Sequence, residues 1–121
     1  MSIEDILTRE LTGSIHFFYD FTNQDETSDG FGLTVDSTKK PERASIASVG
    51  FSLTAWVIAA ERGLIDRPEA LKITRGTLRT LLHHVDHIHG FFAHFLHMDI
   101  GCLLYTSPSP RDRTRSRMQS S

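Results

Sequence analysis

Acidic side chains gather around one polar stretch in the first half of the chain. Several carboxylates flank or lie within residues 22–43, among them Asp20, Asp25, Glu26, Asp29 and Asp36. Two carboxyl groups on either side of a glycosidic bond supply the acid and the base or nucleophile that hydrolyse it. Carboxylates are also the ordinary residues of solvated surface loops. The acidic loop therefore permits glycoside chemistry but does not establish it.

Histidines are a second candidate for chemistry, because the chain has seven and two of them, His83 and His87, are four residues apart. On one helix this spacing places both imidazoles on the same face, as zinc sites do. A metalloprotease motif would have glutamate after His83, whereas the chain has His84 there, and no third ligand is indicated. We interpret these histidines as packed or solvated and predict no metal site.

Aromatic rings form two groups that are suited to a sugar-binding cleft. The first group is Phe17, Phe18, Tyr19 and Phe21, and the second is Phe91, Phe92 and Phe95. Aromatic residues at helical spacing are more often core residues than ligand platforms. We interpret most of these rings as core, while individual rings can still line a cleft.

Apolar periodicity predicts a first helix and then a long loop. Ser2 and Asp5 form a capping-box pattern, and the apolar residues after them recur at helical spacing, which predicts a helix over residues 3–21. Residues 22–43 form a polar loop. Within it, three alternating apolar residues predict a short extended piece: Phe31, Leu33 and Val35.

Two further helices are predicted after the loop. Residues 44–62 are apolar on almost every side, which is typical of a helix buried all round, and Gly63 follows as a C′ glycine. Asp66 and Glu69 predict an N-cap with a capping box for the third helix. An apolar stripe along that helix predicts its buried face: Leu71, Leu78, Leu81, Leu82 and Val85.

These elements together predict an all-α fold, because no alternation of strands and helices appears. A buried helix joined by a short turn to an amphipathic helix is typical of the inner and outer helices of an (α/α) toroid. We predict the first hairpins of such a toroid, incomplete, with the long loop and the short extended segment.

Charge and termini restrict the partners. Residues 102–121 carry four arginines against one acid, or +3, which leaves −5 for residues 1–101 out of a total of −2. An acidic body argues against a nucleic-acid partner, because binding to nucleic acid needs a basic face.

The N-terminal residues lack the basic and apolar regions of a signal peptide, so we expect a cytoplasmic protein. The apolar run of residues 44–62 is shorter than the ~20 residues of a membrane span, so we expect no membrane partner.

The sequence of residues 102–121 indicates a sequencing artefact. Residues 102–112, CLLYTSPSPRD, correspond to one reading frame of a transposon-type sequencing adapter. An index would encode residues 113–115, and the constant adapter sequence would follow as Ser-Arg-Met-Pro-Ser-Ser, where this chain has Gln119 in place of the proline. We therefore divide the chain into a body, residues 1–101, and an adapter-derived tail, residues 102–121, which we expect to be disordered.

Three segments of the body resemble a known family. They are ASIASVGFSLTA at residues 44–55, AERG at residues 60–63 and HGFFAHFL at residues 89–96, and the Phe17-Phe18-Tyr19 run fits the family's opening helix. These segments resemble the bacterial glucoamylase-like family, which includes endo-β-1,2-glucanases and a domain of cyclic β-1,2-glucan synthases. The resemblance covers essentially the whole body.

The resemblance implies a glycoside hydrolase that acts on glucan links of the β-1,2 type, with an oligo- or polysaccharide as partner and no cofactor. It implies that the main catalytic acids lie on later segments, so we expect none in this chain and an inactive fragment. Residues expected to belong to the wall of the cleft are Tyr19, Asp20, Asp36 and His94. The alternative is a small helical binding or interaction module that is not an enzyme.

Overall fold

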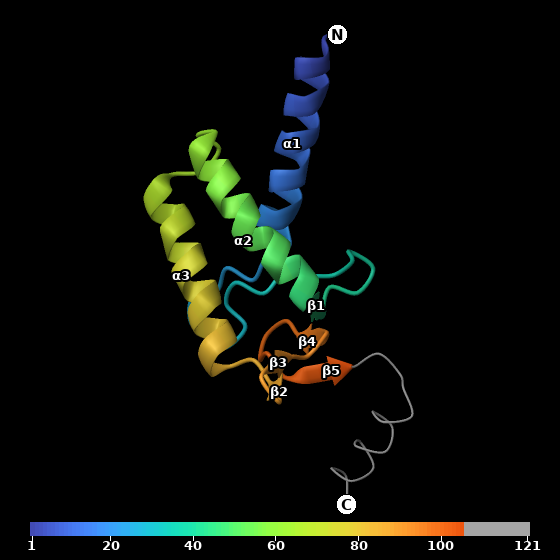
Figure 1. Cartoon of the computed structure of the whole chain (residues 1–121), viewed down its shortest axis with the longest axis vertical. Helices are drawn as coiled ribbons and strands as arrows, with labels where there is room; N and C mark the ends of the chain where they lie inside the picture. The colour runs from blue at the N-terminus through green and yellow to red at the C-terminus, as the bar shows by residue number, and fades with distance from the viewer. Residues whose placement is uncertain (106–121) are drawn as a thin grey trace, which may run out of the picture.

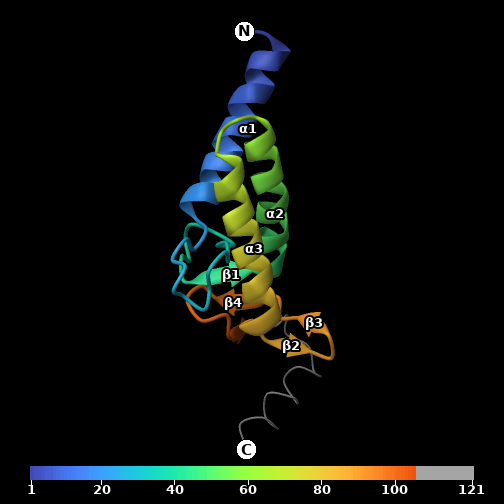
Figure 2. The same cartoon turned by 90° about the vertical axis from the view of Figure 1, so that its left-hand side faces the viewer.

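The computed structural model describes residues 1–105, the last three as backbone only, and contains three helices and five short strands in this range. The helices are α1 (Ile3–Asp20), α2 (Ile46–Glu61) and α3 (Arg67–His83). The strands are β1 (Arg43–Ser45), β2 (His87–Ile88), β3 (Phe91–Phe92), β4 (Phe95–His97) and β5 (Leu103–Tyr105). Helices α2 and α3 lie side by side, and the strands gather at one end of this pair (Figure 1). The first turns of α1 project beyond the other two helices (Figure 2).

The fold is mostly helical, but the prediction of an all-α fold is wrong in one respect. Two small antiparallel sheets are present, one with strand order β1-β4-β5 and one that pairs β2 with β3. In the larger sheet Arg43 pairs with His97, and Ser45 pairs with Phe95. Strands of two or three residues are too short to show alternation in the sequence, and the partner of β1 lies far along the chain. The sequence therefore carries no local signal for this sheet.

Strands β2 and β3 form a hairpin directly after α3. His89 and Gly90, with φ angles of 51° and 83°, make its two-residue turn, a conformation that suits Gly and is tolerated by few other residues. Helix α3 ends at His83, so His87 lies in β2 and the two histidines do not share a helical face. The helical spacing that suggested a zinc pair is therefore not realised.

The predicted caps of the first two helices are confirmed. The Asp5 amide donates to Ser2 Oγ at 3.2 Å and the Ser2 amide donates to Asp5 Oδ2 at 3.1 Å, which completes the capping box of α1. After α2, Gly63 has a φ of 71° and its amide donates to the Ala60 carbonyl at 3.1 Å. The Leu64 amide donates to the Ala59 carbonyl at 2.8 Å, so the helix ends in a Schellman motif.

The predicted capping box of α3 is wrong. Asp66 is the N-cap residue, but its side chain makes no capping hydrogen bond. Glu69 is instead the acceptor of a hydrogen bond from the Tyr19 hydroxyl at 2.7 Å. The Glu69 carboxylate therefore joins α3 to α1, whereas the sequence pattern had predicted that it would cap α3.

The long loop belongs to the core. Thr22 pairs with Thr34 and Val35 pairs with Ala44 in isolated bridges, so the extended piece predicted from Phe31, Leu33 and Val35 is confirmed only at residues 34 and 35, whereas residues 31 and 32 form a turn. The Thr22 and Thr34 hydroxyls are buried and hydrogen-bond to each other at 2.8 Å. Residues 30–35 are all buried. The loop therefore contributes Leu33 and Val35 to the hydrophobic core.

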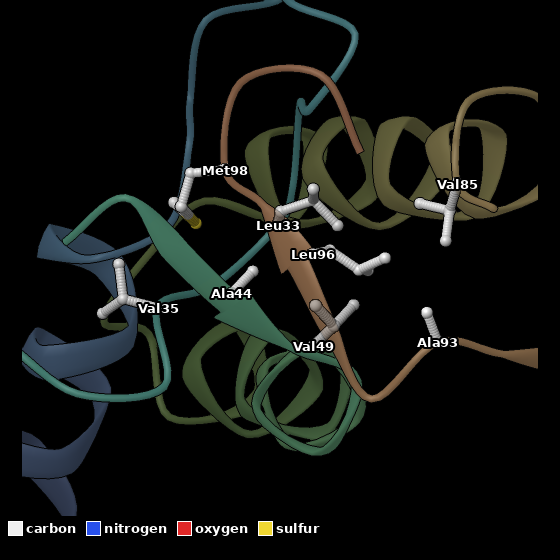
Figure 3. Close-up of a cluster of buried hydrophobic side chains, with 8 residues drawn as sticks. All are labelled: Leu33, Val35, Ala44, Val49, Val85, Ala93, Leu96 and Met98. Atoms are coloured by element: carbon white, nitrogen blue, oxygen red, sulfur yellow. The ribbon is translucent and has the colours of Figure 1, made fainter. Parts of the chain in front are cut away.

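The largest hydrophobic cluster lies where the loop, the sheet and α2 meet (Figure 3). Ala44 of β1 and Leu96 of β4 lie at its centre, and both are fully buried, as are Val49 of α2 and Leu33 of the loop. The other members are Val35, Val85, Ala93 and Met98. A separate cluster joins α2 to α3 through Trp56, Ala70 and Ile73.

The buried face of α3 differs in part from the predicted stripe, of which Val85 is buried just after the helix and Leu81 packs against the largest cluster. Leu71, Leu78 and Leu82 are 49%, 52% and 69% exposed. The buried residues are instead Ala70, Ile73, Thr77 and Thr80. The two threonine hydroxyls can be buried because Thr77 donates to the Ile73 carbonyl and Thr80 donates to the Phe31 carbonyl. Because both hydroxyls have carbonyl acceptors, the loop can cover the side of α3 that carries the threonines.

Helix α2 is buried on one side only, which corrects the prediction of burial all round. Its covered face carries Val49, Ser52, Ala55, Trp56 and Ala59. On the opposite side Phe51 is 68% exposed and Val57 is 65% exposed. Within residues 1–105, none of the helices is both long enough and apolar enough to cross a membrane.

Residues 103–105, at the start of the predicted tail, form β5 and pair with β4. The remainder of that predicted tail, residues 106–121, lies outside the described residues.

A pair of helical glycines tests how tightly the loop packs on α3. A Cβ on Gly76 would approach Phe31 Cε1 to 1.8 Å, whereas a Cβ on Gly50 meets nothing within 4 Å. We expect Gly76→Ala to lower the free energy of unfolding by about 1–3 kcal/mol because the buried ring must move. Gly50→Ala should raise it by about 0.5–1 kcal/mol. Urea unfolding measures both, and an equal effect of the two substitutions would contradict the packing of Phe31 on Gly76.

Candidate functional site

A carboxylate and a guanidinium meet where the loop enters β1. Arg43 Nη2 lies 3.7 Å from Asp36 Oδ2, and the two side chains are 24% and 36% exposed. The Asp36 amide donates to the Arg43 carbonyl at 3.1 Å, so the backbone holds the two residues together as well. An ion pair that is partly open to solvent offers both hydrogen-bond donors and acceptors to a ligand.

An aromatic ring lies beside this ion pair. The Arg43 guanidinium carbon is 4.3 Å from the centre of the Phe95 ring, within the range of a cation–π contact. The His94 ring stacks on Phe95 with a centroid separation of 4.1 Å and an interplanar angle of 9°. Asp36, Arg43, His94 and Phe95 are called the Arg43 group below.

The sheet and a helix start position the Arg43 group. Ser45 of β1 pairs with Phe95 of β4, and the His94 carbonyl accepts the amide of Ile46, the first residue of α2, at 3.0 Å. Ser45 is also the N-cap residue of α2, with its hydroxyl accepting the Ser48 amide at 3.0 Å. The group is therefore fixed to the N-terminal end of α2.

One donor in the group lacks a partner. Arg43 Nε is buried and has no hydrogen-bond acceptor among the described residues. A buried donor without an acceptor carries a desolvation cost.

The four residues predicted for a cleft wall fall into two sets. Asp36 and His94 both belong to the Arg43 group, joined through Arg43 and Phe95. Tyr19 has different contacts: its hydroxyl donates to Glu69, and its ring meets Trp56 edge-on at 6.4 Å. Asp20 is exposed at the last position of α1. Tyr19 is thus a link between helices.

The chemistry of the Arg43 group is that of polar recognition beside a flat ring. A guanidinium, a carboxylate and an imidazole supply donors and acceptors, and the Phe95 ring packs against both the guanidinium and the imidazole. Within residues 1–105, no group of three His, Cys, Asp or Glu side chains could hold a metal ion. The arrangement is suited to binding a polyhydroxylated ligand.

Arg43 is the residue that the sequence analysis missed. It stands immediately before the ASIASVGF segment, at the end of a polar loop where an arginine is unremarkable. Only its pairing with β4, more than fifty positions away in the chain, brings it to Phe95. Phe95 itself was among the aromatic residues considered for a cleft, without any indication of its neighbours.

Comparison of the chain with protein-family models, with curated proteins and with solved structures gives no match.

The Tyr19–Glu69 hydrogen bond is expected to make a pH-dependent contribution to the free energy of unfolding. That bond, together with burial and the charge of Glu69, raises the pKa of Tyr19 above 10.0. A raised pKa in the folded state stabilises the fold below pH 10, and this contribution is lost as pH rises through the folded-state pKa. We expect Tyr19→Phe to cost about 0.5–1 kcal/mol at pH 7 and less above pH 10. Urea unfolding at several pH values measures the difference, and a constant cost would contradict the assignment.

Proposed function

We propose that this chain is the N-terminal part of a glucoamylase-like glycoside hydrolase domain whose parent acts on β-1,2-type glucan. The observation that carries the proposal is the pairing of two segments that resemble this family. Residues 44–45 of the first segment pair with residues 95–96 of the last, and the Ile46 amide donates to the His94 carbonyl. Segments chosen for their resemblance alone are therefore adjacent in the fold and share one part of its core.

Within this proposal the Arg43 group is part of the wall of the sugar-binding cleft. Sugars present hydroxyl groups around their edges and C–H groups on their faces. Arg43 and Asp36 can hydrogen-bond the hydroxyls while an aromatic side chain packs against the C–H face.

Binding rather than bond cleavage is the role proposed for Asp36. Hydrolysis of a glycosidic bond requires two carboxyl groups that flank it. The Asp36 carboxylate faces a guanidinium at 3.7 Å, an arrangement suited to holding a ligand. The catalytic acids are accordingly proposed to lie on later segments of the parent, and this chain alone is proposed to be inactive.

The exposed side of α2 supports the toroid arrangement. Phe51 and Val57 lie on this side and are mostly exposed, although α2 is the most apolar helix. In a toroid of helical hairpins, the next inner helix would cover such a face. A cytoplasmic location and a polysaccharide partner belong to the same proposal.

The first experiment is an amplicon across the Gly101–Cys102 junction from source DNA, sequenced with a different library chemistry. We expect the reads to leave the CLLYTSPSPRD frame and to continue into a long hydrolase gene. The encoded protein should release reducing sugar from linear β-1,2-glucan, whereas the present chain should not. A stop codon near Gly101 would reject this proposal and favour the non-enzymatic binding module.

Two substitutions in the parent enzyme test the Arg43 group. Arg43→Gln and Phe95→Ala should each raise KM for β-1,2-glucan by roughly tenfold, with a smaller change in kcat, because they remove binding contacts. Arg9→Gln is a matched control for Arg43→Gln, since Arg9 is exposed on α1. An unchanged KM in both test variants would contradict the proposal that the Arg43 group lines the cleft.

A further inference from the structure

A concave site lies outside the Arg43 group, between the loop and α3. This cavity has a volume of about 470 Å³, within the usual range of small-ligand sites. One wall is formed by loop residues Glu26, Ser28 and Phe31. The other wall is one face of α3, with residues spaced three and four apart: Lys72, Arg75, Gly76, Arg79 and Thr80.

The cavity has an excess of positive charge. Lys72 is paired with Glu26 at 2.6 Å, and this contact raises the pKa of Lys72. His84, also in the lining, lies 3.7 Å from Asp29. Arg75 and Arg79 make no ion pair within residues 1–105, so two guanidinium groups remain available. Because they are four residues apart on one helix, both can reach the same ligand.

The walls of the cavity are held by close packing. The Phe31 ring lies against Gly76, where a Cβ would come within 1.8 Å of it, and Phe31 is only 7% exposed. The Thr80 hydroxyl donates to the Phe31 carbonyl at 2.6 Å, and Gly32 packs on Thr77 with a φ of 87°. A site with fixed walls loses little conformational entropy when a ligand binds.

We propose that this cavity binds a phosphomonoester. Arg75 and Arg79 bind the phosphate oxygens, because guanidinium groups match the geometry of phosphate and two of them balance its double charge. The cavity is larger than a phosphate group needs, and Leu71 and Phe31 line it, so the organic part of the ester packs against an apolar wall. This inference does not depend on the proposed hydrolase function.

The test is a titration of the ¹⁵N-labelled full chain with phenyl phosphate and, separately, with inorganic phosphate, at pH 7.5 and constant ionic strength. We expect saturable shifts of the amide signals of residues 26–31 and 68–84. Phenyl phosphate should bind more tightly than inorganic phosphate because its ring contacts the apolar wall. Shifts that rise linearly without saturation, or that avoid these two segments, would overturn the proposal.

Charge-matched variants separate a specific site from general attraction of anions. Arg75→Gln with Arg79→Gln should weaken phenyl phosphate binding by at least about tenfold, since two charge-assisted contacts are lost. Arg9→Gln with Arg62→Gln removes the same charge from exposed positions outside the cavity and should leave the affinity unchanged. Because all four side chains are exposed, the amide spectra should keep their dispersion. Equal weakening in the two double variants would contradict the proposed site.

Discussion

The antiparallel contact between β1 and β4 is the constraint on which the rest of the structure depends. It places Ala44 opposite Leu96, both fully buried, at the centre of the largest hydrophobic cluster. The same contact sets the start of α2, because the His94 carbonyl accepts the first amide of that helix. Arg43 meets Phe95 for the same reason. A few backbone hydrogen bonds between remote segments thus determine the core, a helix start and the Arg43 group.

The loop before β1 shows how a polar segment can become structural. Residues 30–35 are buried because their hydroxyl and backbone groups find partners, such as the Thr22–Thr34 pair and the Thr80 bond to the Phe31 carbonyl. Satisfied polar groups can be buried at little cost, while unsatisfied ones cannot. The threonine face of α3 is therefore covered, and its leucines at positions 71, 78 and 82 are left exposed.

Local signals in the sequence predicted local structure well. The Ser2–Asp5 capping box and the Gly63 helix end follow from residues within four positions of each other, so the sequence specifies them directly. The sheet, the covered face of α3 and the partner of Glu69 depend on contacts between distant residues. Asp36 and His94 were predicted as residues of a site. Their connection through Arg43 could not be predicted, because it depends on the register in which β1 pairs with β4.

The wide separation of β1 and β4 along the chain also has a consequence for biosynthesis. A ribosome delivers the polypeptide from its N-terminus, so α1, the loop and α2 emerge well before Leu96 is available to fill the centre of their cluster. Contacts between remote segments slow folding because the intervening chain must first be ordered. Until β4 has been synthesised, Leu33, Val35 and Val49 lack their main partner. The nascent chain therefore exposes this apolar surface until β4 has emerged, which is the interval in which a chaperone would have the greatest effect on its yield.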